Sequence, residues 1–246
     1  MKITTTTFST AAILSLLCTP AALANDNTQQ GFSLGAKLGT LGLGLEADYA
    51  FNEKWNGRIQ FNSYTYDDDF EEDDINYTGE IDLSSIGALV DYRPFSGAFR
   101  LSAGVYSNSN ELNGTAVSLG NEVFDIGDLS YRGSSTDPLT LTTNVELGDG
   151  TAGYLGVGWG NTYGNGFKFS FEVGVLLSGS PTVSLDATGS AQLVGVDNVT
   201  FDVNDSTNPF AVQLQQEVEQ EARNLEDDIS DFEYYPVISV GFAYRF

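Results

Sequence analysis

Histidine is absent from this 246-residue sequence, and cysteine occurs once, at position 18. The lack of histidine excludes every nucleophilic mechanism that depends on a Ser–His or Cys–His pair. A lone cysteine excludes an internal disulfide and a metal centre made of several thiolates. The carboxylates form no constellation for acid–base chemistry, so the sequence predicts a protein that is not an enzyme, with no catalytic residues, cofactor or metal site.

Basic residues are also scarce, since 10 lysines and arginines stand against 34 aspartates and glutamates. The formal net charge of −24 excludes electrostatic binding of nucleic acid. A chain of this charge is expected to repel anions and to gather cations around it.

Long apolar runs are missing, and no stretch reaches the roughly 20 residues that a membrane-spanning helix needs. The short apolar run Ala11–Cys18 precedes the small-x-small site Ala22–Ala24, a pattern typical of a secretory signal peptide. We therefore expect residues 1–24 to be a signal peptide and the mature chain to begin near Asn25. Leu17 occupies the position where a lipoprotein leader has a small residue, so lipidation of Cys18 is not expected.

The C-terminal stretch, residues 232–246, alternates from Ile238 onward between large apolar and small or polar side chains. Period two over this length indicates a strand. An apolar face that ends on Phe246 suits a lipid-facing strand that closes a barrel in a Gram-negative outer membrane. Phe242, Tyr244 and Phe246 are the predicted signal for the barrel-assembly machinery, and an edge strand of a soluble sandwich is the alternative.

Seven earlier stretches alternate in the same way, which predicts an all-β fold: an eight-stranded antiparallel transmembrane β-barrel over residues 25–246. The expected strands are 32–39, 43–51, 55–66, 75–92, 99–105, 153–160, 167–175 and the C-terminal stretch. In the fourth, Ile81 and Leu83 are out of phase with Ile86, so we expect a bulge near Ser84 and Ser85. A lipocalin-type soluble barrel would need its apolar face inside, and the charged opposite face argues against it.

The links between these strands fall into two groups by length: most of the short ones have a few residues, and the others are long. The long links, about 67–74, 107–151 and 178–231, all fall on the external side if both termini are periplasmic, which is the arrangement of outer-membrane barrels. We expect a multi-pass monomer in contact with outer-membrane lipid and lipopolysaccharide. The last long link is expected to contain a short helix that Asn208 caps and Pro209 begins.

The polar faces of the strands predict a set of charged residues that line the lumen: Lys37, Glu46, Asp48, Arg58, Asp91, Arg93, Arg100, Lys168, Glu172 and Arg245. Their signs balance if the bulge also turns Glu80 and Asp82 inward. An eight-stranded barrel is just wide enough for side chains to fill it. Two interpretations stay open: a plugged interior held by salt bridges, and a narrow, gated polar path.

The external links hold acidic residues that are predicted to attract cations: Asp67, Asp68, Asp69, Glu71, Glu72, Asp73, Asp74, Glu217, Glu219, Glu221, Glu226, Asp227 and Asp228. The first group alternates carboxylates as a calcium loop does, but it lacks the glycine and the final glutamate of that loop, which favours a solvated acidic tip. The second group belongs either to a helix lying on the neighbouring loops or to a lid over the barrel mouth.

Several runs of the sequence resemble the CarO family of outer-membrane proteins: Tyr154–Gly158, Phe171–Val175, Ser178–Pro181 with Val183, Glu217–Arg223, Tyr235–Val237 and, more loosely, residues 35–64. The resemblance implies an eight-stranded barrel associated with passage of small cationic solutes, ornithine and other basic amino acids, and linked to carbapenem entry. It carries over no catalytic or substrate-binding residue. The alternative is a non-conducting barrel for structure, adhesion, stress protection or divalent-bridged contact with lipopolysaccharide.

Overall fold

The computed structural model describes residues 30–72, 75–118, 120, 123–127, 129–148, 150–160, 165–195 and 199–246. The predicted signal peptide lies outside these ranges, as do Asp73 and Asp74. In chain order the elements are β1 (Gly31–Gly39), β2 (Gly42–Ala50), β3 (Trp55–Glu72), β4 (Ile75–Tyr92), β5 (Phe99–Asn108), β6 (Glu111–Ser118), β7 (Val123–Ile126), β8 (Leu129–Gly133), β9 (Leu139–Glu146), β10 (Thr151–Gly160), β11 (Gly166–Leu177), β12 (Thr182–Thr188), β13 (Ser190–Leu193), β14 (Thr200–Asp202), α1 (Pro209–Ile229) and β15 (Tyr234–Arg245).

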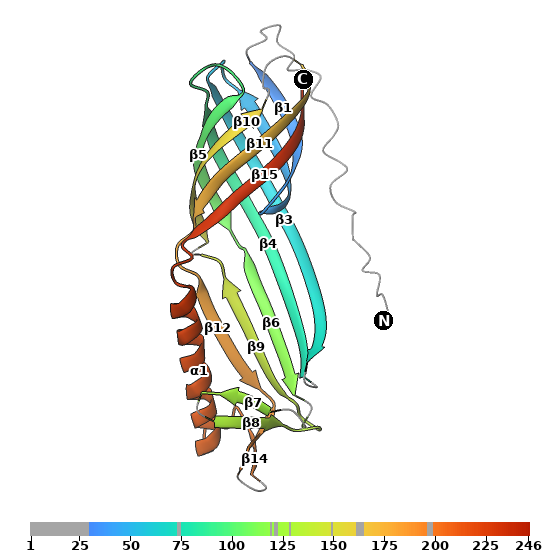
Figure 1. Ribbon diagram of the computed structural model, residues 1–246, viewed down its shortest axis with the longest axis vertical. Coiled ribbons are helices and arrows are strands. Elements are labelled where there is room, and N and C mark those ends of the chain that lie inside the picture. Colours follow the sequence, from blue (N-terminus) through green and yellow to red (C-terminus); the bar gives the residue numbers. More distant parts are fainter. Residues whose placement is uncertain are drawn as a thin grey trace.

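An antiparallel ring of strands, here called the barrel, forms the upper part of the molecule in Figure 1. Going around it, β1, β2, β3, β4, β5, β10, β11 and β15 each pair with the next strand. β15 pairs back with β1, with Ser33 opposite Arg245 and Gly39 opposite Ser239. The predicted antiparallel, mostly β fold is confirmed.

The outer surface of the barrel is apolar and exposed. The large exposed side chains include Leu43, Leu45, Ile59, Phe61, Ile86, Val90, Leu101, Val105, Leu155, Phe169, Ile238, Val240 and Phe242. Aromatic pairs gather at the end where β2–β3, β4–β5 and β10–β11 are joined by short turns: Trp55 with Tyr92, Phe99 with Trp159, and Phe167 with Tyr244. The period-two pattern of each strand therefore places its apolar face outward.

Beyond the barrel, β3 and β4 continue as the first two strands of a projecting sheet whose order is β3-β4-β6-β9-β12. Each of the two is 18 residues long, and Figure 1 shows them running from one end of the molecule far toward the other. The links expected as loops at 67–74, 107–151 and 178–231 thus consist largely of strands and α1. The acidic run 67–72 is the end of β3 rather than a loop tip.

The predicted bulge in β4 is wrong. The pairing of β4 with β3 runs in one unbroken register, from Tyr92 opposite Trp55 to Ile75 opposite Glu72. The polarity of the two faces changes where the strand leaves the barrel, and this change mimics a shift of register in the sequence. Glu80 and Asp82 consequently stay on the outward face.

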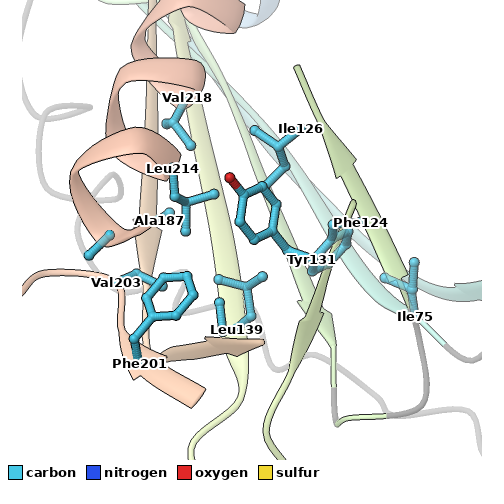
Figure 2. Packing of buried hydrophobic residues seen from close by; sticks show 12 residues of the cluster. Ile75, Phe124, Ile126, Tyr131, Leu139, Ala187, Phe201, Val203, Leu214 and Val218 are labelled. Atoms are coloured by element: carbon cyan, nitrogen blue, oxygen red, sulfur yellow. The ribbon is translucent and has the colours of Figure 1, made fainter. Parts of the chain in front are cut away.

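A second core lies under α1. Figure 2 shows Leu214 and Val218 of α1 packed toward Tyr131 and Leu139, which come from β8 and β9. A four-stranded sheet of order β14-β13-β8-β7, here called the small sheet, completes this core against the inward face of the projecting sheet. Together, the projecting sheet, the small sheet and α1 form the projection.

The predicted helix start is confirmed. The side chain of Asn208 accepts a hydrogen bond from the Phe210 N–H at 2.9 Å, and Pro209 occupies the first turn. Asn208 gives a hydrogen-bond partner to one of the free N–H groups of the first turn, and Pro209 has no N–H that needs a partner. The helix therefore begins at this point. α1 lies along β12 and away from the barrel in Figure 1, as a surface helix does, and it does not cover the barrel mouth. Within the described residues, no helix is long and apolar enough to span a membrane.

Candidate functional site in the barrel interior

Six buried charged residues form one ion-pair network across the middle of the barrel: Lys37, Glu46, Arg58, Asp91, Arg100 and Glu172. Arg58 is at its centre. Its Nη1 lies 2.9 Å from the Oε2 atoms of both Glu46 and Glu172, and its Nε lies 2.8 Å from Asp91 Oδ2. Three basic and three acidic groups thus neutralise one another in a space where an unpaired charge would be costly.

The network takes one charged residue from each of six strands, β1 to β5 and β11. The other two barrel strands contribute glycine at this level. Gly158 of β10 lies opposite both Arg100 and Glu172, and a Cβ there would meet the Arg100 guanidinium at 2.8 Å. Gly241 of β15 lies opposite Lys37, and its Cβ would meet the Lys37 Cγ at 3.2 Å. The glycines leave the space that the long charged side chains fill.

Two buried tyrosines cover the network on the side of the projection. The Tyr106 hydroxyl donates to Gln60 Oε1 at 2.5 Å, and the Tyr154 hydroxyl donates to Glu172 Oε1 at 2.6 Å. The rings meet edge to face, with centroids 5.7 Å apart. Their polar tips therefore extend the network, while their rings begin an apolar layer.

Glycines also make room for these rings. A Cβ at Gly156 or Gly174 would overlap the Tyr154 ring and hydroxyl, and a Cβ at Gly87 would overlap the Tyr106 ring. The inward-facing glycines of β4, β10 and β11 are thus explained by interior packing.

An apolar layer packs with the two tyrosines in one buried cluster, made of Leu41, Leu89, Ala152, Leu176 and Val237. The partly buried Tyr235 joins it and donates its hydroxyl to the Thr40 carbonyl at 2.6 Å. This layer is not among the features predicted from the sequence. A signal was available: Leu89, Leu176 and Val237 are large apolar residues on faces that are otherwise small or polar.

The remaining predicted lumen residues lie toward the end with the short turns. Asp48, Arg93 and Lys168 line a cavity of about 40 Å³ together with Glu46, Arg58 and Asp91. Arg245, also buried, lies against Gly31 at the same end. A second cavity, of about 10 Å³, lies on the other side of the network beside Lys37, Gln60 and Glu172. Since a cavity needs roughly 10–15 Å³ of this kind of volume to hold one water, these two cavities have room for a few waters, and side chains fill the rest of the interior between them.

The prediction that the interior charges balance is wrong. The ten residues placed on the inward face comprise six basic and four acidic side chains, because Glu80 and Asp82 point outward. Glu80 instead accepts from Asn113 at 3.4 Å, and Asp82 accepts from Thr65 at 3.2 Å, both on the projecting sheet. The surplus of two positive charges lies outside the balanced network, toward the end with the short turns.

The acidic residues predicted to attract cations lie on the projection. Asp67, Asp68, Asp69 and Glu71 are exposed along β3, whereas Glu217, Glu219, Glu221, Glu226, Asp227 and Asp228 follow α1. Glu226 accepts from the Val183 N–H at 3.1 Å, which fastens α1 to β12. In the part of the chain that the structure describes, no three acidic residues are arranged to hold a metal ion.

These features define a class: an antiparallel barrel, apolar outside and filled by ion pairs, that carries a sheet-and-helix projection. Two solved structures resemble the chain over most of its length. The crystal structure of Acinetobacter baumannii CarO matches with a TM-score of 0.54 and 19% identity over 88% of this chain and 98% of that one. A. baumannii CarO2 matches with a TM-score of 0.55 and 20% identity over 90% and 100%.

The chain therefore has a CarO-type fold, as the sequence resemblance implies. No family model matches the sequence. A search of curated protein sequences also finds no match.

Proposed function

We propose that the chain is an eight-stranded outer-membrane barrel that admits small solutes through a path closed at rest. The apolar outer surface and the aromatic residues near the short turns support a location in the membrane, because lipid-facing barrels carry an apolar band flanked by aromatic residues. A soluble barrel would leave this surface in contact with water.

The observation that carries the proposal is the arrangement around Lys37. Its Nζ lies 3.2 Å from Glu46 Oε2 and 3.7 Å from Glu172 Oε2, distances longer than those of Arg58. An amino acid brings an ammonium and a carboxylate together. Its ammonium can replace that of Lys37 on the two glutamates while its carboxylate pairs with the displaced lysine, so that no buried charge is left alone.

A preference for basic amino acids such as ornithine is part of the proposal. The exposed acids of β3 and α1 raise the local concentration of cations. A side-chain ammonium also matches the group that Lys37 presents to Glu46 and Glu172. A carbapenem is far bulkier than the space that one displaced lysine opens, so its passage would need a larger rearrangement.

Solute flux into liposomes that contain the refolded mature protein tests the proposal. Ornithine and arginine should enter faster than glutamate or a neutral sugar of similar size. Lys37→Met removes the resident ammonium from Glu46 and Glu172 but also removes the partner of the solute carboxylate, so entry of putrescine, which has no carboxylate, should rise more than entry of ornithine. Lys54→Met, at an exposed turn position, is the matched control and should leave entry of both solutes unchanged.

A second function is favoured by the cavity volumes. The two cavities described above, of about 40 Å³ and 10 Å³, are too small to form a solute path. A barrel packed in this way suits a non-conducting anchor for the projection. In that case no solute would enter above the rate of empty liposomes, and neither lysine variant would alter this.

A further inference from the structure

The outer part of β3 is an open edge of the projecting sheet. β2 pairs with β3 only as far as Leu43 opposite Ser63, because the chain turns back into β1 at Thr40–Leu41. From Tyr64 to Glu72, β3 pairs with β4 on one side, and no strand of the described residues lies on the other. At about 3.3 Å per residue this edge is roughly 30 Å long, and Figure 1 shows it along the flank opposite α1.

The two faces of this edge differ in chemistry. Tyr64, Tyr66 and Phe70 share one face and are 43%, 48% and 54% exposed, with the exposed Asp68 between the last two. Phe70 stacks on Tyr77 of β4 with ring centroids 5.0 Å apart, which holds the aromatic face in place. The opposite face presents an exposed row of Thr65, Asp67, Asp69 and Glu71.

The edge lacks most devices that protect edge strands from pairing. It contains no proline, no lysine and no bulge, and its register against β4 is regular to the end. Of these devices, only charged side chains are present, and all of them are acidic. No basic residue occurs between Arg58 and Arg93, so a second copy of this edge would set carboxylates opposite carboxylates. The acids thus oppose self-pairing but favour a strand of opposite charge.

We propose that the β3 edge docks an extended, basic polypeptide strand in which basic and apolar residues alternate. The backbone of the partner would add to the sheet, as in β-strand addition to an exposed edge. Its apolar residues would lie beside Tyr64, Tyr66 and Phe70, and its basic residues would lie beside the acidic row. This docking does not depend on whether the barrel conducts.

Peptide binding to the full-length refolded protein tests the proposal. The probe is a nine-residue fluorescent peptide of alternating lysine and valine, with binding followed by anisotropy. Three comparison peptides are a block peptide of the same composition, an alternating peptide N-methylated on alternate residues, and the glutamate counterpart. The alternating lysine peptide should bind at least about tenfold more tightly than each of them, since only it combines charge, phase and free N–H groups. Equal binding of the block or N-methylated peptide would reduce the interaction to charge attraction and overturn the proposal.

Variants of the protein locate the site. The triple substitution Asp67→Asn, Asp69→Asn and Glu71→Gln should weaken binding of the alternating peptide at least about tenfold, a loss typical of several cross-strand charge pairs. The matched control, Asp227→Asn, Asp228→Asn and Asp231→Asn, removes the same charge from exposed positions at the end of α1 and should leave binding unchanged. Equal losses in both triples would overturn the proposal.

Hydrogen exchange supplies a readout that needs no substitution. Docking should slow exchange of the backbone amides that face outward within residues 64–72, while the amides of α1 keep their rates. Unchanged exchange along this edge in the presence of saturating peptide would show that the peptide binds elsewhere.

Discussion

β3 and β4 carry polar side chains inward and apolar side chains outward within the barrel, and they reverse this polarity in the projection. In β3 the inward residues change from Arg58 and Gln60 to Tyr64 and Tyr66, while the outward residues change from Ile59 to Asp67. The reversal takes place at a point where Ser63 lies opposite Ser84. Since the register is unbroken, the backbone stays regular across this point and only the polarity of the two faces changes. The proposed location would produce this reversal, with lipid outside the barrel and water outside the projection.

The barrel has an interior of ion pairs, whereas the projection has an apolar core. Of the substitutions that test this difference, Glu172→Gln is expected to have the largest effect. The substitution removes the carboxylate that contacts Lys37, Arg58 and Arg100, and leaves buried cations without full compensation. We expect the free energy of unfolding to fall by about 3–5 kcal/mol. Urea titration in detergent micelles measures it, and Asp231→Asn, at an exposed position, should change it by less than about 0.5 kcal/mol. A similarly small loss for Glu172→Gln would mean that the network does not support the barrel.

Leu214→Ala tests the apolar core of the projection in the same way. Leu214 is fully buried between α1 and the small sheet. Its truncation should lower the stability of the projection by about 2–5 kcal/mol and leave the barrel folded. Proteolysis of the projection, compared with heat-dependent mobility of the barrel on gels, separates the two. Leu225→Ala, at a position 39% exposed, is the control; equal sensitivity of both variants would show that Leu214 is not a core residue.

Gly156→Ala probes the fit of the tyrosine layer and is expected to have the smallest effect of the three. The added methyl group would overlap Tyr154, whose hydroxyl is fixed by Glu172. Overpacking of this kind costs about 1–3 kcal/mol. Gly79→Ala, where a Cβ meets open space, is the matched control in a strand of the projection. Equal stability of the two variants, measured by urea titration, would contradict a tightly packed interior.

Much of the barrel could be predicted because its strands obey one rule. Each has a purely apolar face, so their positions agree with the structure to within a few residues, apart from β3, which continues beyond its predicted end at Tyr66. The charged residues could be assigned to the interior for the same reason: Glu46 and Glu172 alternate with the apolar residues of their strands and therefore lie on the other face. Which six of the ten would meet could not be predicted, since this depends on the stagger between strands.

The projection could not be predicted because its strands do not obey that rule. β6 and β9 are rich in serine, threonine and asparagine, with small or isolated apolar residues, and their partners are distant in sequence. β4 did carry a signal, the phase change between Leu83 and Ile86. A bulge and a change of face polarity along one regular strand produce the same pattern in a sequence, so the sequence does not distinguish them.

The unbroken run of β3 and β4 has a mechanical consequence. Two paired strands of 18 residues, about 60 Å long, form a continuous two-stranded ribbon from the barrel to the tip of the projection. A force pulling the tip away from the barrel would be carried as tension along the backbones of both strands, so resistance would not depend on hydrogen bonds that could open one after another. Whatever the projection touches is thereby held at a fixed distance and orientation relative to the barrel.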